Sequence, residues 1–186
     1  MKRLLCLIIL FLVFCGCHNG KDQLDDSLSL RQQLLSSDKC TFTAEITADY
    51  GEELYQFTVE CQGDKQGNLE FSVVAPESIA GITGKITELG GSLTFDDTVL
   101  AFPPMADGQF TPAAAPWIFL KTLRSGYIVS STSEGSFTYL QIDDSYSDEA
   151  LHLDIWLNEE QNPVRGEILW QGRRILSLSV KDFKIL

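Results

Sequence analysis

The sequence predicts a mainly β protein of the α+β class, in which one curved antiparallel sheet carries an N-terminal helix and one inserted helix. Apolar and polar residues alternate with a period of two through most of the chain, a pattern typical of strands that bury one face. Two segments, residues 22–36 and 113–125, show helical spacing instead.

The first residues have the pattern of a secretory signal. Met1, Lys2 and Arg3 form a cationic head, and an uninterrupted apolar run from Leu4 to Phe14 follows it. This run is too short to cross a bilayer as a helix, which takes about 20 apolar residues. Residues 1–16 are therefore predicted to be a signal peptide that is removed after export.

Cys17 is the predicted site of lipid attachment. The stretch from Phe14 to Cys17 looks like a bacterial lipobox, in which small residues precede a cysteine that becomes the first residue of the mature protein. Cys15 fits less well, because Phe14 would then stand where the pattern has a small residue. Two or more acyl chains make anchoring stable, so we expect a tether to the extracytoplasmic face of the cell membrane. The alternative is a plain signal peptide or a short membrane anchor.

Charge excludes several classes of partner. The formal net charge is −12, and loss of Lys2 and Arg3 with the signal makes it −14. Such a molecule repels nucleic acids and anionic lipid headgroups, which excludes a nucleic-acid partner. The segment from Cys17 to Leu186 is long enough for one globular domain.

The segment before the sheet is predicted to be a tether followed by a helix. The polar connector HNGKDQ follows Cys17, and leucines at positions 24, 28, 34 and 35 then recur with loose helical spacing. Residues 17–38 would thus comprise the lipidated cysteine, the tether and the helix. Residues 39–186 would form the sheet domain.

Two alternating segments, residues 40–50 and 54–61, are predicted to form the first hairpin. The register that keeps apolar residues opposite one another places Cys40 opposite Cys61. Opposed residues have Cβ atoms about 4.5–5.5 Å apart, which suits a disulfide. An even pair of cysteines in an exported domain also favours this disulfide. The alternative is two free, buried thiols.

A long meander is predicted for the rest of the chain, interrupted by the inserted helix. The predicted strands are residues 68–75, 82–88, 92–95, 98–102, 137–142, 151–157, 164–170 and 174–180. The helix is expected to begin at Ala113 or Pro116 and to end at Ser125.

Apolar residues also oppose each other in the closing strands. Ile168 is predicted to face Leu153 on one side and Leu176 on the other, and Leu157 to face Val164. A sheet with one buried face requires this agreement, because a slip of one residue would turn the apolar set outward.

Five segments together carry a resemblance to a known family. They are the lipobox, the hairpin CTFTAEITADYGEELYQFTVEC, the turn APESIAGITG, the helix TPAAAPWIFLKTL and the closing segment LDIWLNEEQNPVRGEILWQGRRILSLSVKDF. This arrangement resembles the LolA/LolB superfamily of periplasmic lipoprotein carriers and receptors, with its Gram-positive lipoprotein relatives. The resemblance covers most of residues 24–184 and implies an incomplete antiparallel β-barrel, or half-barrel, with helices in its mouth. It also implies an apolar cavity for acyl chains and no catalytic residues.

Apolar side chains on the alternating strands are the candidates for lining such a cavity. They are Phe42, Phe57, Val59, Phe71, Val73, Leu153 and Ile168. The alternative is an ordinary packed core, since any small barrel fills its interior with side chains of this kind.

An enzyme, a metal site or a bound cofactor is not expected. His152 and Asp154 share one face of a strand, but neither a serine nucleophile motif nor HExxH accompanies them, so His152 is interpreted as incidental. The acidic run 143–149 lacks the glycine and the distant glutamate of a calcium loop. It is interpreted as a solvated turn.

Trp156 is the candidate residue for docking a protein partner. It lies on the face opposite Leu153, and exposed tryptophans often anchor interfaces. The alternative is that a helix covers it. Two functions remain open: a tethered lipoprotein whose concave face binds lipid or the acyl chain of a lipoprotein, or a tethered adaptor with a filled barrel that binds another exported or membrane protein.

Overall fold

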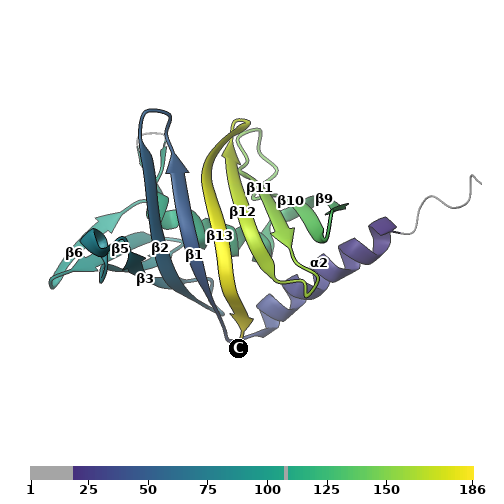
Figure 1. The fold of residues 1–186 in the computed structure, drawn as a ribbon, viewed down its shortest axis with the longest axis horizontal. Coiled ribbons are helices and arrows are strands. Elements are labelled where there is room, and N and C mark those ends of the chain that lie inside the picture. The colour runs from purple at the N-terminus through teal and green to yellow at the C-terminus, as the bar shows by residue number, and fades with distance from the viewer. Residues whose placement is uncertain (1–18, 107–108) are drawn as a thin grey trace, which may run out of the picture.

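The computed structural model describes residues 19–106 and 109–186. The predicted signal peptide, residues 1–16, and the predicted lipidation site Cys17 lie outside the described residues. Most of the described chain forms one strongly curved sheet with two helices, α2 (Asn19–Ser36) and α3 (Ala115–Ser125) (Figure 1). Within these described ranges, neither helix is long and apolar enough to span a bilayer.

The sheet has 11 antiparallel strands in the order β6-β5-β4-β3-β2-β1-β13-β12-β11-β10-β9. Their bounds are β1 (Lys39–Asp49), β2 (Leu54–Asp64), β3 (Leu69–Ala75), β4 (Thr83–Thr87), β5 (Gly90–Phe95), β6 (Thr98–Phe102), β9 (Tyr127–Glu134), β10 (Phe137–Asp143), β11 (His152–Leu157), β12 (Pro163–Trp170) and β13 (Arg173–Ile185). The two edges, β6 and β9, do not pair with each other, so the sheet stays open. The predicted half-barrel is confirmed.

Three short elements connect the strands. They are two 3₁₀ turns, η1 (Glu77–Ile79) and η2 (Pro112–Ala114), and the small hairpin of β7 (Met105–Ala106) and β8 (Gln109–Phe110). The last strand, β13, pairs with the first, β1, and so joins the two meanders in the middle of the sheet.

Alternation of side chains defines the buried face of the sheet. Along β1 the even-numbered residues from Cys40 to Ala48 are at most 3% exposed, and the residues between them are polar and more accessible. The same alternation continues in β11, where Leu153, Ile155 and Leu157 are fully buried. This face supplies the core, as a sheet with one solvated face requires.

Helix α3 lies against the buried face and contacts β2, β10, β12 and β13. It follows η2 directly, and Pro116 stands in its first turn, where the missing backbone N–H has no partner to lose. The predicted helix is confirmed, with its start at Ala115.

Helix α2 packs against α3 and β9. Leu30 and Leu34 are its buried side chains in the last two turns. The helix begins at Asn19, so most of the predicted polar connector HNGKDQ is helical instead. Sequence spacing missed this turn because its polar residues carry no apolar period.

The predicted register of the first hairpin is wrong by two residues. Cys61 lies opposite Phe42, and Cys40 lies opposite Gly63. The strands end at Asp49 and Leu54, which pair across a loop longer than the predicted turn.

The predicted disulfide is not formed. Cys40 and Cys61 are free and buried, and they stand diagonally across the two strands. Diagonal neighbours lie about 7–8 Å apart, beyond the spacing that a disulfide spans without backbone movement. Burial raises the pKa of both thiols.

The closing registers are largely confirmed. Ile168 faces Leu153 and Leu176 as predicted. Leu157, however, pairs with Pro163 and not Val164, because the register shifts by one residue next to Trp156.

Candidate functional site

The concave face of the half-barrel is the candidate site that the sequence analysis identified. Six of its seven predicted lining residues are at most 5% exposed, and Phe57 is half-buried. The buried six are Phe42, Val59, Phe71, Val73, Leu153 and Ile168. They belong to one continuous core that includes the apolar side chains of α3.

Two glycines of the sheet allow α3 to approach this face closely. A Cβ added at Gly166 would lie 2.7 Å from a ring carbon of Phe119, and one at Gly63 would lie 2.3 Å from Leu120 Cδ2. Both distances are too short for real contacts, so α3 sits where side chains of the sheet would otherwise be. Phe119 is fully buried, with its ring centroid 6.1 Å from that of Phe42. The concave face is therefore occupied by the protein's own helix.

Polar contacts hold α3 in this position. Trp117 Nε1 donates to the carbonyl of Gly67 at 3.0 Å. Arg124 is only 8% exposed, and its guanidinium donates to the carbonyls of Leu34 at 3.2 Å, Lys65 at 3.3 Å and Asp64. One side chain thus ties α3 both to the end of α2 and to the β2–β3 turn.

A hollow of about 410 Å³ lies at the other end of the core, between the tips of the β1–β2 and β12–β13 hairpins, with polar walls at Asp49, Gln171 and Arg173. Tyr50, Phe110, Trp170 and Ile175 contribute its apolar walls. The Phe110 and Trp170 rings meet edge to face, with centroids 5.7 Å apart, and Tyr50 donates its hydroxyl proton to the carbonyl of Phe110. Sequence reasoning missed this hollow, because Phe110 comes from the segment before α3 while the other walls come from hairpin ends.

A second hollow, of about 660 Å³, lies on the outer face of β1–β5. Its walls carry hydroxyl, amide and charged groups, including Glu60, Gln62, Lys85 and Lys184. Phe42, Cys61 and Phe71 also contribute to its walls.

Trp156 lies on the outer face, where it packs among neighbours from the strands β9, β10 and β12. Its Nε1 donates to Glu134 Oε2 at 2.6 Å, and the Arg165 guanidinium lies 4.4 Å from the ring centroid. The Tyr139 ring lies 5.1 Å away. Trp156 is consequently half-buried, with its polar atom already satisfied.

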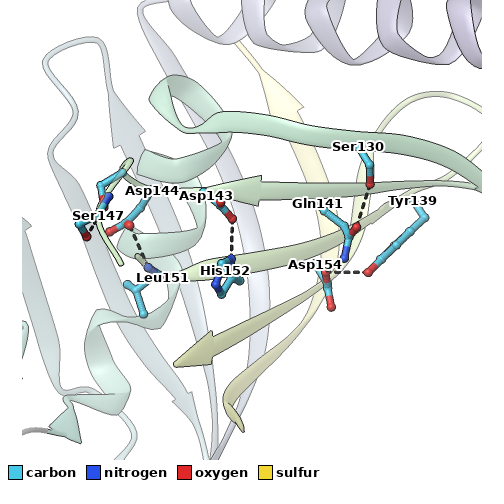
Figure 2. Close-up of polar contacts among 10 residues, drawn as sticks. Ser130, Tyr139, Gln141, Asp143, Asp144, Ser147, Leu151, His152 and Asp154 are labelled. Atoms are coloured by element: carbon cyan, nitrogen blue, oxygen red, sulfur yellow. Dashed lines mark hydrogen bonds and ion pairs between the residues drawn. The ribbon is translucent and has the colours of Figure 1, made fainter. Parts of the chain in front are cut away.

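Nearby polar residues of the outer face form two separate groups (Figure 2). His152 Nδ1 lies 2.5 Å from Asp143 Oδ1. Asp154 instead accepts hydrogen bonds from the Tyr139 hydroxyl at 2.7 Å and from Gln141 Nε2 at 3.5 Å. His152 and Asp154 share a face of β11, and each bonds to side chains of the neighbouring strand β10.

Burial, and after it the hydrogen bond to Asp154, raises the pKa of Tyr139 to about 12.

In the acidic run, residues 143–149, Asp144 accepts a hydrogen bond from the backbone N–H of Leu151 at 2.9 Å, which shapes the loop between β10 and β11 (Figure 2). Among residues 19–106 and 109–186, no group of histidine, cysteine and carboxylate side chains is arranged to hold a metal ion.

No model of a known protein family matches this chain, and no curated protein sequence matches it. Solved structures do resemble it. One is a LolA superfamily protein from Nitrosomonas europaea, with 11% identity over 86% of this chain and 93% of that chain and a TM-score of 0.45. Another is an outer membrane lipoprotein-sorting protein domain from Vibrio parahaemolyticus, with 11% identity over 90% and 93% and a TM-score of 0.47.

A third similar structure is that of the CwlD amidase from Clostridioides difficile in complex with the GerS lipoprotein, with 13% identity over 92% of this chain and 99% of that chain and a TM-score of 0.45. The chain is an open half-barrel, and its fold is similar to the folds in these three structures. At these identities the resemblance concerns the fold alone.

Proposed function

We propose that the chain is an extracytoplasmic lipoprotein, anchored through acyl groups on Cys17, whose half-barrel is an adaptor for another exported protein. The observation that carries this proposal is the occupation of the concave face by α3. A half-barrel that is filled by its own helix offers its outer surface and its edges, and not its interior, to a partner.

The cost of emptying the interior supports this choice. The large buried apolar side chains of α3 are Trp117, Ile118, Phe119, Leu120 and Leu123. At about 1.5–3 kcal/mol for each buried side chain, exposing them costs roughly 10 kcal/mol. This is comparable to the whole net stability of a typical domain, about 5–15 kcal/mol. An acyl chain that displaced α3 would have to supply a similar free energy.

The position of the anchor also favours an adaptor. Helix α2 begins at Asn19, two residues after Cys17, and leads directly into β1. With lipid on Cys17, the domain would stay within a short reach of the membrane. A tether of this kind raises the effective concentration of the domain near other membrane-associated proteins. Replacing Cys17 with alanine should release the chain from the membrane fraction, and mass analysis of the native protein should find acyl groups on this residue.

Acyl-chain binding is the second candidate, and the observation that favours it is the hollow whose apolar walls are Tyr50, Phe110 and Trp170. At about 410 Å³ this hollow has room for part of a lipid tail without removal of α3. If lipid binding is the function, Trp170→Asp, in the wall of this hollow, should abolish binding of a fluorescent fatty acid by the mature domain.

The experiment that separates the two functions is gentle extraction of the anchored chain from its host membranes, followed by size fractionation and quantitative analysis of protein and lipid. The adaptor proposal expects one protein to co-migrate in stoichiometric amount and no lipid beyond the anchor. Stoichiometric lipid without a protein partner would contradict it.

A further inference from the structure

β6 is an open edge of the sheet that carries apolar side chains. It stands at one end of the sheet order, and no strand of the described chain pairs with its outer side. Val99 is 66% exposed, Leu100 is 64% exposed, and Phe95 at the end of β5 is 53% exposed. Proteins usually blunt such edges with charged side chains or proline, because an unpaired edge is a template for another strand. The β6 sequence, TVLAF, contains neither.

The other edge of the sheet, β9, is less available, although its Tyr127 and Val129 are 40% and 61% exposed. Its sequence, YIVSSTSE, is mostly polar in its second half and carries a charged residue. Helix α2 also packs against it. β6 is therefore the edge that remains available for strand pairing.

The β5–β6 turn determines which backbone groups of β6 are free. The two-residue turn Asp96–Asp97 has φ values of 46° and 61°, and the residues on its two sides pair directly. In an antiparallel ladder, pairs that exchange hydrogen bonds alternate with pairs that do not. Counted from the turn, Leu100 directs its N–H toward β5, whereas Val99 and Ala101 direct theirs toward the open edge.

The turn also gives this edge a negative end. Asp96 and Asp97 are exposed, and none of the ion pairs between described residues involves either of them. An antiparallel partner strand would place its C-terminal end beside these carboxylates, where a cationic side chain is favoured.

We propose that β6 is the docking edge for an extended segment of another exported protein, apolar at its pairing positions and carrying Lys or Arg beside Asp96 and Asp97. The proposal rests on the adaptor function and names its surface. β6 lies at the opposite end of the molecule from the start of α2, so it faces away from the proposed anchor (Figure 1). A second copy of this chain is the less suitable occupant, because its net charge of −12 repels a like molecule.

The test is photo-crosslinking of the full, anchored chain in its host cells, with a benzophenone amino acid at Val99 or, as control, at the exposed Gln56 of β2. Val99 is expected to give one discrete protein adduct, and Gln56 none. Ala101→Pro removes an outward N–H and should weaken the adduct about tenfold or more, whereas Ala101→Val keeps that N–H and should leave it unchanged. Asp96→Asn with Asp97→Asn should weaken it about threefold or more without disturbing the turn, because asparagine tolerates positive φ.

Equal adducts in Ala101→Pro and Ala101→Val, at equal protein levels, would overturn the proposal. An adduct with the mass of two copies of this chain would overturn the choice of partner. A protein adduct at Gln56 and none at Val99 would reject β6 while leaving the adaptor function standing. No protein adduct at either position would reject the β6 edge, and a lipid adduct in its place would also contradict the adaptor function.

Discussion

Phe119→Ala tests directly whether α3 fills the half-barrel. Phe119 is fully buried, packs on Phe42, and covers Gly166, so its removal leaves a cavity that the rigid sheet cannot close. Core substitutions of this kind cost about 3–5 kcal/mol. For a domain of this size, each kcal/mol lowers the melting temperature by about 2–4 °C, so the expected decrease is roughly 6–20 °C.

The assay is urea unfolding of the mature domain without its anchor, followed by tryptophan fluorescence. Phe95→Ala is the matched control, because Phe95 is 53% exposed and its loss should change the free energy of unfolding by no more than about 0.5 kcal/mol. A change below about 1 kcal/mol for Phe119→Ala would refute the packing of α3 against the sheet.

Three further predictions concern Arg124, Tyr139 and the two buried thiols. Arg124→Met should lower the free energy of unfolding by about 1–3 kcal/mol, since it removes the guanidinium's hydrogen bonds to three carbonyls, of which Leu34 and Asp64 keep a second donor in Ser37 Oγ and the Gly67 N–H; Arg124→Lys should recover part of this loss in the same urea assay. Tyr139 has a folded pKa raised to about 12, so the stability that it contributes over Tyr139→Phe should be constant below pH 10 and should vanish between pH 10 and 12; a difference that grows in this window would contradict the assignment. In the domain without Cys17, Cys40 and Cys61 should resist a thiol reagent when folded and yield two free thiols per chain in denaturant without reductant, whereas a yield of none would indicate a disulfide.

Sequence periodicity predicted the fold because the sheet has one buried face. In β1 and β11 every second side chain enters the core, so the strands, their direction and the closing registers could be read from the chain. β9 was missed because an edge strand that pairs on one side only needs no apolar period, and its sequence is largely serine and threonine.

The candidate site was harder to predict, because periodicity identifies which residues face inward and not what they meet. Phe42 and Ile168 do face inward, but the occupant of the concave face depends on Gly63 and Gly166, whose significance appears only when α3 is placed over them. The error in the first hairpin has a similar origin. A shift of two residues keeps the same apolar faces together, so the pattern could not distinguish Cys40 opposite Cys61 from Cys40 opposite Gly63.

Amide hydrogen exchange of α3 in the mature protein isolated from its host is the most direct measurement of whether the half-barrel is filled. If α3 is a permanent part of the core, its amides from Phe119 to Leu123 should exchange as slowly as those of β1 and β13, through global unfolding alone. Exchange in α3 many orders of magnitude faster than in those strands would mean that the concave face opens in the native state. This result would contradict a filled half-barrel and would favour a ligand-binding cavity.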